Sequence, residues 1–352
     1  MSRFISERFE KLNAYTPGEQ PRDFSYIKLN TNESPYPPAP KVVEAIGQKE
    51  LQELRLYSDP ECRFLREALA AHYGVTPANV TVGNGSDELL SFAFMAFCDK
   101  RIGVSYPEIS YGFYSVFADL YGLTTTELPL RDDFTVNPED YFNLGTTIVL
   151  ANPNAPTGCC LPVADIEHIV AANPNNVVII DEAYIDFGGE SCIPLTKSYD
   201  NLLVVQTYSK SRSLAGARLG YAVGSVELIA DLEKLRYSTN PYNVNRLTLL
   251  VGTAALSQQE YYDNNNHQII LNREYTVKGL RNLGFVLTDS KANFIFAKHP
   301  KLSGQTLYQR LREQGILVRH FGKPLISDYV RITIGTEEQM KTLINTLRGM
   351  LD

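Results

Sequence analysis

Cysteine and histidine are scarce in this chain, and neither is spaced for a metal site or a disulfide framework. The 352 residues include five cysteines and five histidines. No two cysteines form a Cys-x-x-Cys pair, and no two histidines stand four residues apart. An odd number of cysteines without such spacing favours reduced thiols, as in the cytosol. We therefore expect a cytoplasmic protein that holds no metal.

Long apolar segments and runs of basic residues are missing as well. No segment approaches the ~20 apolar residues of a membrane span. No run of Lys or Arg is longer than two, and the formal net charge is −7, so the chain has no general field for nucleic acid. The opening Met1–Phe4 leads into charged residues and not into the apolar core of a signal peptide. These absences predict a soluble protein that binds neither nucleic acid nor a membrane.

What the chain does contain is an ordinary globular composition with alternating helix and strand patterns. Hydrophobic residues make up 44% and charged residues 21% of the chain, as in ordinary globular proteins. The length of 352 residues suits two domains. Two near-continuous apolar runs, Val177–Ile180 and Leu202–Val205, suit strands that are covered on both faces. The pattern predicts an α/β fold in which helices flank a mostly parallel sheet.

The expected elements divide the chain into three parts. We expect an N-terminal arm over residues 1–30, a large α/β domain over 31–243, and a smaller α+β domain over 244–352 with which the arm is associated. In the large domain we expect helices over 59–73, 86–97 and 111–120 and strands over 101–105, 146–151, 177–180 and 202–206. In the small domain we expect a helical stretch over 245–283 that breaks near Ser257, strands over 285–287, 294–297 and 330–334, and helices over 303–314 and 337–351.

Three loops at the ends of predicted strands carry the polar residues of a candidate site. The first, Gly83–Glu88, directly precedes a helix. Glycines let the backbone approach an anion, and the helix N-terminus offers free N–H groups. Ser86 and Asp87 are equally ordinary N-cap residues, so this loop alone can also be a capped helix.

The second and third loops add a carboxylate and an amine. Asp181 leaves the first apolar run and can face a ligand at the carboxyl edge of the sheet, although capping or ion pairing would also explain it. Lys210 follows the second apolar run, where desolvation would lower its pKa and free the amine as a nucleophile. Thr207, Ser209 and Arg218 flank Lys210 at −3, −1 and +8 and supply donors suited to a phosphate.

Together these groups match the needs of one cofactor. Pyridoxal 5′-phosphate (PLP) requires an amine for a Schiff base, an acidic partner for its ring nitrogen and a phosphate cradle. Lys210 can supply the amine and Asp181 the acid. Gly85, Ser209 and Arg218 can form the cradle. A P-loop sequence is absent, and a dinucleotide fingerprint fails because position 88 is Glu where Gly is needed.

In this order along the chain, the motifs resemble those of the fold-type I PLP-dependent aminotransferases, and among them the histidinol-phosphate subfamily. The resemblance runs from about Tyr15 to the C-terminus. The matching segments are Leu29–Pro35 (LNTNESP), Gly85–Glu88 (GSDE), Asn152–Gly158 (NPNAPTG), Asp181–Tyr184 (DEAY), Ser209–Arg218 (SKSRSLAGAR) and Val330–Gly335 (VRITIG).

The resemblance implies roles for the matching residues. Lys210 would form the Schiff base and shift protons, and Asp181 would hold the protonated ring nitrogen. Tyr184 would hydrogen-bond the ring hydroxyl, and Tyr111 would stack on the ring. The phosphate would be held by Gly85, Ser86, Asp87, Thr207, Ser209 and Arg218, and by Tyr57 of a second subunit. A homodimer with shared sites follows from that last role.

One matching segment departs from the family pattern. An asparagine usually precedes Pro-Thr-Gly and contacts the ring hydroxyl, but this chain has Ala155 there, with Asn154 one residue earlier. Either Asn154 substitutes from a shifted backbone, or Tyr184 carries that contact alone.

The resemblance also implies the substrates. Arg331 would grip the anionic end of the substrate, Arg319 would be a second anion-binding residue, and Tyr15 would close over the same group. Asn32 is a further expected substrate contact. Two arginines suit a dianionic phosphate because guanidinium can bind two oxygens at once. The implied reaction turns L-histidinol phosphate and 2-oxoglutarate into imidazole acetol phosphate and L-glutamate, in histidine biosynthesis.

Three other functions stay open on the sequence. They are a threonine-phosphate decarboxylase of the same family, an aromatic amino-acid aminotransferase, and a non-catalytic regulatory protein that binds PLP. The acidic chain shows no extra DNA-binding segment, which argues against the last of these.

Overall fold

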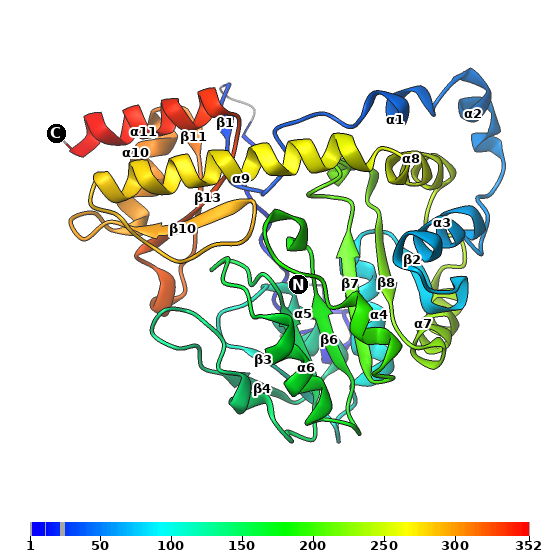
Figure 1. The fold of residues 1–352 in the computed structure, drawn as a ribbon. Coiled ribbons are helices and arrows are strands. Elements are labelled where there is room, and N and C mark those ends of the chain that lie inside the picture. Colours follow the sequence, from blue (N-terminus) through cyan, green and yellow to red (C-terminus); the bar gives the residue numbers. More distant parts are fainter. Residues whose placement is uncertain (1, 11, 22–24, 352) are drawn as a thin grey trace.

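A mixed, mostly parallel sheet lies at the centre of the larger part of the molecule (Figure 1). The computed structural model describes residues 2–10, 12–21 and 25–351. In this part of the chain seven strands form the sheet in the order β2-β8-β7-β6-β5-β3-β4. They are β2 Val80–Gly83, β3 Val104–Pro107, β4 Thr125–Leu128, β5 Thr147–Ala151, β6 Val178–Asp181, β7 Leu202–Thr207 and β8 Gly220–Val223. Strand β8 is antiparallel to β2 and β7, and the other neighbours run parallel, so the expected α/β sheet is confirmed.

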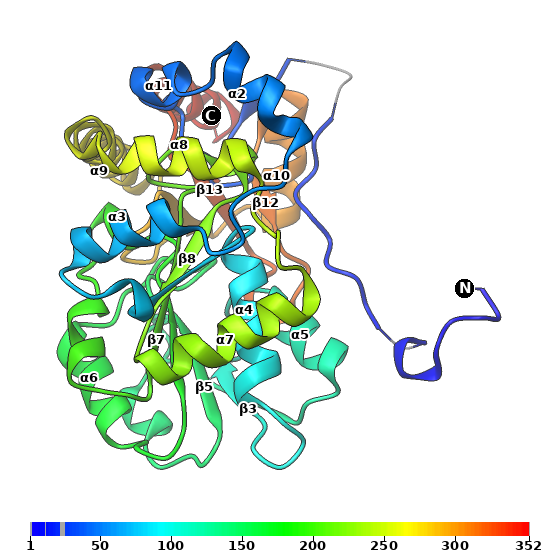
Figure 2. The same ribbon diagram turned by 90° about the vertical axis from the view of Figure 1, so that its right-hand side faces the viewer.

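Helices cover both faces of this sheet because its strands are apolar on both sides. Val178 and Ile180 pack in one hydrophobic core, and Ile179, between them, packs in another on the opposite face. In Figure 2, α6 lies to the left of the strands and α5 to the right. The helices of this part are α1 Pro40–Glu44, α2 Gln48–Gln52, α3 Arg63–Tyr73, α4 Ser86–Phe97, α5 Phe113–Tyr121, α6 Val163–Ala171, α7 Val226–Thr239 and α8 Arg246–Leu256.

Most of the expected elements agree with the structure to within about two residues, but α3 and β3 begin later than expected. Helix α3 begins at Arg63 and not at Asp59, whose carboxylate accepts a hydrogen bond from the backbone N–H of Arg63 at 2.9 Å. Strands β2, β4 and β8 were not expected from the sequence.

A strand was expected over 101–105, but β3 begins only at Val104. The carboxylate of Asp99 accepts hydrogen bonds from the backbone N–H groups of Arg101 and Ile102, at 2.7 and 2.8 Å. These bonds hold a turn, and Gly103 completes it with a φ of 69°. Local side-chain bonding therefore overrides the apolar pattern at this point.

A smaller antiparallel sheet forms the second part of the molecule. Its order is β12-β13-β10-β9, and a separate parallel pair joins β1 to β11. The strands are β1 Ile27–Lys28, β9 Val286–Leu287, β10 Phe294–Lys298, β11 Ile316–Leu317, β12 Arg319–His320 and β13 Tyr329–Thr333. The helices are α9 Gln259–Asn282, α10 Gly304–Glu313 and α11 Glu337–Leu351. Since β1 pairs with β11, the chain just before Leu29 lies against this smaller part.

Helix α9 contributes residues both to one core of the large sheet and to the core of the smaller sheet. The break expected near Ser257 is confirmed, because α8 ends at Leu256 and α9 begins at Gln259. Helix α8 was expected in the small domain, yet its Val251 and Ala255 pack in the core of the large sheet. Tyr262 of α9 also packs in that core. Further along α9, Ile269 and Leu280 pack in the core of the smaller sheet.

The N-terminal residues extend away from the rest of the chain (Figure 2). Residues 1, 11 and 22–24 of the expected arm, and residue 352, lie outside the described residues. Among the described helices, none is long and apolar enough to cross a membrane.

Gly220 lies where β8 approaches the start of α4 closely, and its substitution tests that packing. A Cβ at Gly220 would lie 2.5 Å from the backbone nitrogen of Ser86 and 2.6 Å from the carbonyl carbon of Gly85. Because these are backbone atoms, Gly220→Ala should lower the free energy of unfolding by about 1–3 kcal/mol. Gly322→Ala is the matched control, since no atom lies within 4 Å of its added Cβ. Urea titration of both variants measures the difference, and equal midpoints would contradict the packing argument.

Candidate active site

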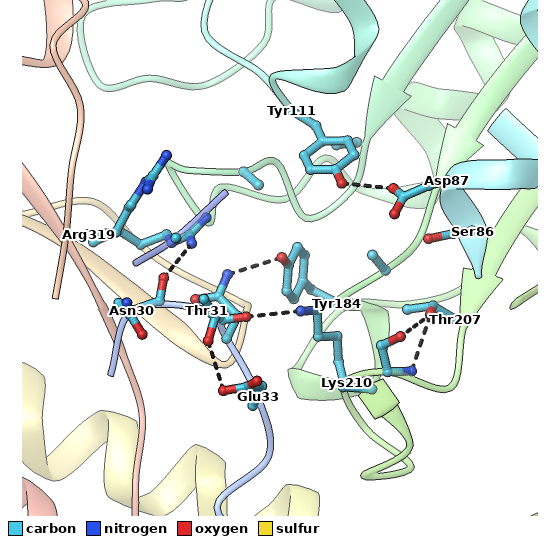
Figure 3. A pocket seen from close by; sticks show the side chains of 18 of the residues that line it. Asn30, Thr31, Glu33, Ser86, Asp87, Tyr111, Tyr184, Thr207, Lys210 and Arg319 are labelled. Atoms are coloured by element: carbon cyan, nitrogen blue, oxygen red, sulfur yellow. Dashed lines mark hydrogen bonds between the residues drawn. The ribbon is translucent and has the colours of Figure 1, made fainter. Parts of the chain in front are cut away.

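A cavity of about 410 Å³ opens at the carboxyl edge of the large sheet (Figure 3). Strands β6 and β7 are parallel neighbours, so the residues that follow them meet at this edge. The smaller sheet and the segment after β1 close the other side. Of the residues predicted from the sequence, the cavity is lined by Tyr15, Asn32, Ser86, Asp87, Tyr111, Asp181, Tyr184, Thr207, Ser209, Lys210, Arg218, Arg319 and Arg331.

Lys210 presents an activated amine to the cavity. Its Nζ donates a hydrogen bond to the backbone carbonyl of Thr31 at 3.2 Å. The pKa of Lys210 is lowered to about 8, mainly by burial and also by the positive charge of Arg331, against the opposing charges of Glu33 and Asp87. An amine with this pKa is partly neutral near pH 7 and can act as a nucleophile.

Asp181 presents a buried carboxylate at the end of β6. It is 4% exposed. Its Oδ2 accepts a hydrogen bond from the hydroxyl of Tyr114 at 2.9 Å, and its Oδ1 accepts one from the backbone N–H of Ala183 at 3.2 Å. The pKa of Asp181 is raised to about 6, because burial outweighs the hydrogen bond from Tyr114, which acts in the opposite direction. Tyr114 was not predicted from the sequence, although it lies one helical turn after Tyr111.

Tyr184 has a hydroxyl whose orientation is fixed from behind. Nδ2 of Asn32 donates to the Tyr184 hydroxyl oxygen at 3.0 Å. Asn32 is itself held, because its Oδ1 accepts from Oγ1 of Thr333 at 2.9 Å. The hydroxyl proton of Tyr184 therefore remains available to a ligand. Burial raises the pKa of Tyr184, which keeps that proton in place.

The start of α4 forms one end of the cavity, where Ser86, Asp87 and Thr207 lie in Figure 3. First-turn N–H groups of a helix have no partner within the helix and attract an anion. The carboxylate of Asp87 accepts from the Tyr111 hydroxyl at 2.8 Å and pairs with Nη2 of Arg218 at 3.1 Å. Asp87 was expected to hold a phosphate, but its carboxylate is engaged elsewhere and would repel one. Its contribution to anion binding would be its backbone N–H.

Gly85 supports this end of the cavity from behind and does not line it. Its φ is 84°, in the left-handed region that favours glycine. A Cβ there would lie 2.5 Å from Nη2 of Arg218. Glycine at this position therefore leaves the space that the Arg218 guanidinium occupies.

Two arginines line the opposite end, where Figure 3 shows Arg319. Arg319 and Arg331 are directly opposite each other on the antiparallel strands β12 and β13, so their side chains share one face. Nη2 of Arg331 donates to the carbonyl of Asn30 at 3.1 Å, but its Nε is buried without a partner in the described structure. Arg319 donates to the carbonyls of Thr16 and Pro17 at 2.9 and 3.1 Å. Two like charges held together in this way favour an anion between them.

The segment after residue 14 lies across the cavity near these arginines. The ring of Tyr15 stacks on Phe113 of α5, with ring centroids 4.3 Å apart. Because Arg319 holds the next two carbonyls, the segment is tied to both parts of the molecule. Tyr15 and Gly18 of this segment line the cavity.

Asn154 does not take the place of the missing asparagine. Its Nδ2 donates to the carbonyl of Ile109 and to Oγ1 of Thr157, at 2.9 and 3.1 Å. Its Oδ1 accepts from Ser110 at 2.9 Å. Ala155, and not Asn154, lines the cavity. A ligand's hydroxyl group there would meet Tyr184 without help from this loop.

Tyr57 lies outside the cavity of its own chain. Its ring stacks on Tyr242 with centroids 4.4 Å apart, and it is 79% exposed. Any role of Tyr57 in a site therefore requires a second chain. Among the described residues, no group of three or more His, Cys, Asp or Glu side chains is placed to hold a metal ion.

The chain belongs to the class I and II aminotransferase family, whose sequence pattern matches residues 25–347. It is similar over its whole length to the histidinol-phosphate aminotransferase of Brachyspira hyodysenteriae, with 48% identity over 352 residues that cover 100% of this chain and 99% of that protein. The corresponding protein of a Marinomonas species is 49% identical over 353 residues, covering 99% of this chain and 100% of its own.

Solved structures agree with this relationship. Histidinol-phosphate aminotransferase from Sinorhizobium meliloti, in complex with pyridoxal-5′-phosphate, has a TM-score of 0.84 and 25% identity, over 92% of this chain and 91% of that one. A putative histidinol-phosphate aminotransferase from Erwinia carotovora atroseptica has a TM-score of 0.85 and 25% identity, over 92% and 96%.

The environment of Lys210 predicts how its amine reacts with small aldehydes. Reductive methylation of Lys210 should rise with pH through about 8, because burial lowers its pKa to that value. Exposed lysines should follow a midpoint near ~10.4. Arg331→Gln should move the Lys210 midpoint upward, since loss of a nearby positive charge favours the ammonium form. Mass spectrometry of the labelled peptides gives both midpoints. Arg310→Gln, an exposed change on α10, is the control, and a midpoint that Arg331→Gln leaves unmoved would contradict the electrostatic argument.

Proposed function

We propose that this chain is a PLP-dependent transaminase that transfers the amino group of L-histidinol phosphate to 2-oxoglutarate, a step of histidine biosynthesis. The observation that carries the proposal is a cavity with two different ends. One end has an activated amine, a buried carboxylate and a helix N-terminus, and the other has two facing arginines. Identities of 48% and 49% to histidinol-phosphate aminotransferases, over nearly all of both chains, support the choice of substrate.

The residues at the sheet end fit PLP. Lys210 would bind the aldehyde carbon, Asp181 would face the ring nitrogen, and Tyr184 would donate to the ring hydroxyl. Tyr111 would lie against the ring. The phosphate would be held by Ser86, Ser209 and Arg218, with Thr207 beside them and the first N–H groups of α4 below. When bound, PLP supplies an electron sink for the negative charge that develops on the substrate carbon.

Lys210 would also move the proton of the reaction. Since burial lowers its pKa to about 8, its Nζ can accept a proton from the substrate carbon and return it. The carbonyl of Thr31, 3.2 Å from Nζ, holds the amine at the boundary between the two parts of the molecule. Asp181 would keep the ring nitrogen protonated throughout, because its carboxylate stays beside that nitrogen.

The arginine end fits the anionic groups of both substrates. The unpartnered Nε of Arg331 and the guanidinium of Arg319 can bind a phosphate with several charge-assisted hydrogen bonds. The distal carboxylate of 2-oxoglutarate can use the same donors. Tyr15 would cover this anion, and Asn32 would keep Tyr184 in place beside the substrate. If the segment that carries Tyr15 covers the bound anion, the loss of water around it would strengthen these interactions.

A single half-reaction tests the proposal. The PLP-loaded protein, given L-histidinol phosphate without an acceptor, should release one imidazole acetol phosphate per site, and added 2-oxoglutarate should then yield one L-glutamate. Lys210→Ala should slow this step by about 100-fold or more, because it removes the proton-transfer group. The exposed Lys301→Ala is the control. Chromatography of the products gives the result. Keto acid from L-phenylalanine, or carbon dioxide from O-phospho-L-threonine, with no product from L-histidinol phosphate, would refute the substrate.

We propose further that two chains form a dimer in which Tyr57 completes the partner's site. Exposed apolar side chains occur on α1 to α3 and on the turn that follows α2, and Figure 1 shows these helices at one side of the molecule. Val43, Leu51, Leu54 and Phe64 are 64%, 50%, 51% and 75% exposed. An apolar surface of this kind marks a protein interface. Tyr57, which is 79% exposed, lies between Leu54 and Phe64 along the chain.

Mixed dimers test the shared site. Tyr57→Ala should weaken PLP binding by about tenfold, through loss of a hydrogen bond to a charged phosphate. In a heterodimer of Tyr57→Ala with Lys210→Ala, one site carries both changes and the other carries neither. Its turnover should therefore approach half that of the unmodified dimer. A heterodimer of Arg218→Ala with Lys210→Ala is the control and should not recover, because both residues serve the site of their own chain. Failure of the first pair to recover would place Tyr57 outside the site.

We also propose a boundary between the two domains and a cellular location for the protein. We propose that the large domain extends through α8 and that the change to the small domain falls within α9, between Tyr262 and Ile269. This placement rests on the packing of the two cores. All five cysteines are free, which suits the reducing cytosol and supports a cytoplasmic location.

A further inference from the structure

Tyr114 is a buried polar side chain that lies behind the cavity and does not line it. It is 0% exposed. Its hydroxyl donates to Oδ2 of Asp181 at 2.9 Å, and the other oxygen of that carboxylate accepts from the N–H of Ala183 at 3.2 Å. Each oxygen of Asp181 therefore has one protein donor. The remaining lone pairs are available to a group in the cavity.

The strand and helix periods of β6 and α5 place Asp181 and Tyr114 next to each other. Successive residues of β6 point to opposite faces, so Asp181 lies on the same face as Ile179, which α4 and α5 cover. On α5 and the turn before it, Tyr111 and Tyr114 are three residues apart and share one side. Tyr111 lines the cavity, and Tyr114 lies deeper, with the two rings edge to face at 5.7 Å.

Aromatic neighbours confine the ring of Tyr114. Phe94 of α4 lies 6.2 Å away between centroids, and Tyr106 of β3 lies 5.9 Å away. The ring is closely surrounded, so its hydroxyl stays directed at Asp181. Burial raises the pKa of Tyr114 well above its usual value, so the hydroxyl stays protonated and remains a donor.

The ionisation of Asp181 depends on few groups. Its pKa is raised to about 6, mainly by burial and also by the negative charge of Asp87. The Tyr114 hydroxyl is the largest influence in the other direction, followed by the N–H of Ala183 and the charge of Lys210. Because a hydrogen bond to an ionised group contributes more than one between neutral groups, Tyr114 favours the carboxylate over the carboxylic acid.

We propose that Tyr114 is a positioning residue, which holds Asp181 ionised and aimed at the ring nitrogen of the cofactor. The inference rests on the proposed function, in which Asp181 faces that nitrogen. Tyr114 itself touches neither cofactor nor substrate. It acts through Asp181, so its removal should weaken only interactions that involve the ring nitrogen.

Binding of two matched ligands to the cofactor-free full-length chain tests the proposal. One ligand is pyridoxamine 5′-phosphate, and the other is its analogue with a C–H group in place of the ring nitrogen. Calorimetry gives the dissociation constant of each, and their ratio is the preference for the ring nitrogen. A change that merely loosens the cavity weakens both ligands and leaves the ratio unmoved. Four proteins are compared: the unmodified chain, Tyr114→Phe, Asp181→Asn and Tyr141→Phe.

Tyr114→Phe should lower the preference by about tenfold, as expected for loss of a hydrogen bond to a charged group. Tyr141→Phe is the matched control, since Tyr141 is 0% exposed and its hydroxyl has no hydrogen-bond partner in the described structure. It should keep the full preference. The preference should also depend on pH. In the unmodified chain it should be lost as pH falls through about 6, where Asp181 takes up a proton. In Tyr114→Phe it should be lost at higher pH, because removal of a donor to the carboxylate raises the pKa.

The outcomes separate the inference from the proposed function. If Asp181→Asn abolishes the preference and Tyr114→Phe keeps both the preference and its pH profile, the role of Tyr114 is refuted and that of Asp181 stands. If Asp181→Asn keeps the full preference, Asp181 does not face the ring nitrogen, and the proposed cofactor arrangement falls.

Discussion

Burial of ionisable groups at the ends of adjacent strands is the constraint on which the rest of the site depends. Free aspartate and lysine side chains have pKa values about 6 units apart. Here burial raises the pKa of Asp181 to about 6 and lowers that of Lys210 to about 8. Both groups can therefore change charge near neutral pH. Among their neighbours, Tyr114 favours the ionised form of the acid and Arg331 the neutral form of the amine, so the site depends on the residues packed around it.

That packing involves both the large and the smaller sheet, because both contribute residues that line the cavity. The large sheet supplies Asp181 and Lys210 because parallel strands end at a common edge. The smaller sheet supplies Arg319 and Arg331 because an antiparallel register sets them side by side. Gly220 lets the start of α4 approach the sheet, which brings the helix N-terminus to the same edge. The distance between the amine and the arginine pair is therefore a property of how the two parts of the chain are joined.

The sequence was informative wherever function follows from position along a strand. Lys210 and Asp181 were predicted because each leaves an apolar run at its carboxyl end. Tyr114 was missed because a tyrosine in an amphipathic helix of a chain with 21 tyrosines has the pattern of a core residue. Only the three-dimensional path shows that its hydroxyl faces a carboxylate. The engagement of Asp87 with Arg218 and the turning of Asn154 toward Ile109 likewise depend on distant contacts that no local pattern encodes.

Helix α9 connects the large and small parts of the molecule, so its orientation affects how they lie relative to each other. Its 24 residues span about 36 Å, at 1.5 Å per residue. Tyr262 anchors its beginning in one core and Leu280 its end in the other. Because the helix is long, a tilt of α9 by about 3° about its first turn would displace its last turn by about 2 Å. A change in the packing around Tyr262, outside the cavity, would therefore be expected to alter the distance between the amine of Lys210 and the guanidinium groups of Arg319 and Arg331. That distance limits the length of the substrate that the cavity can hold.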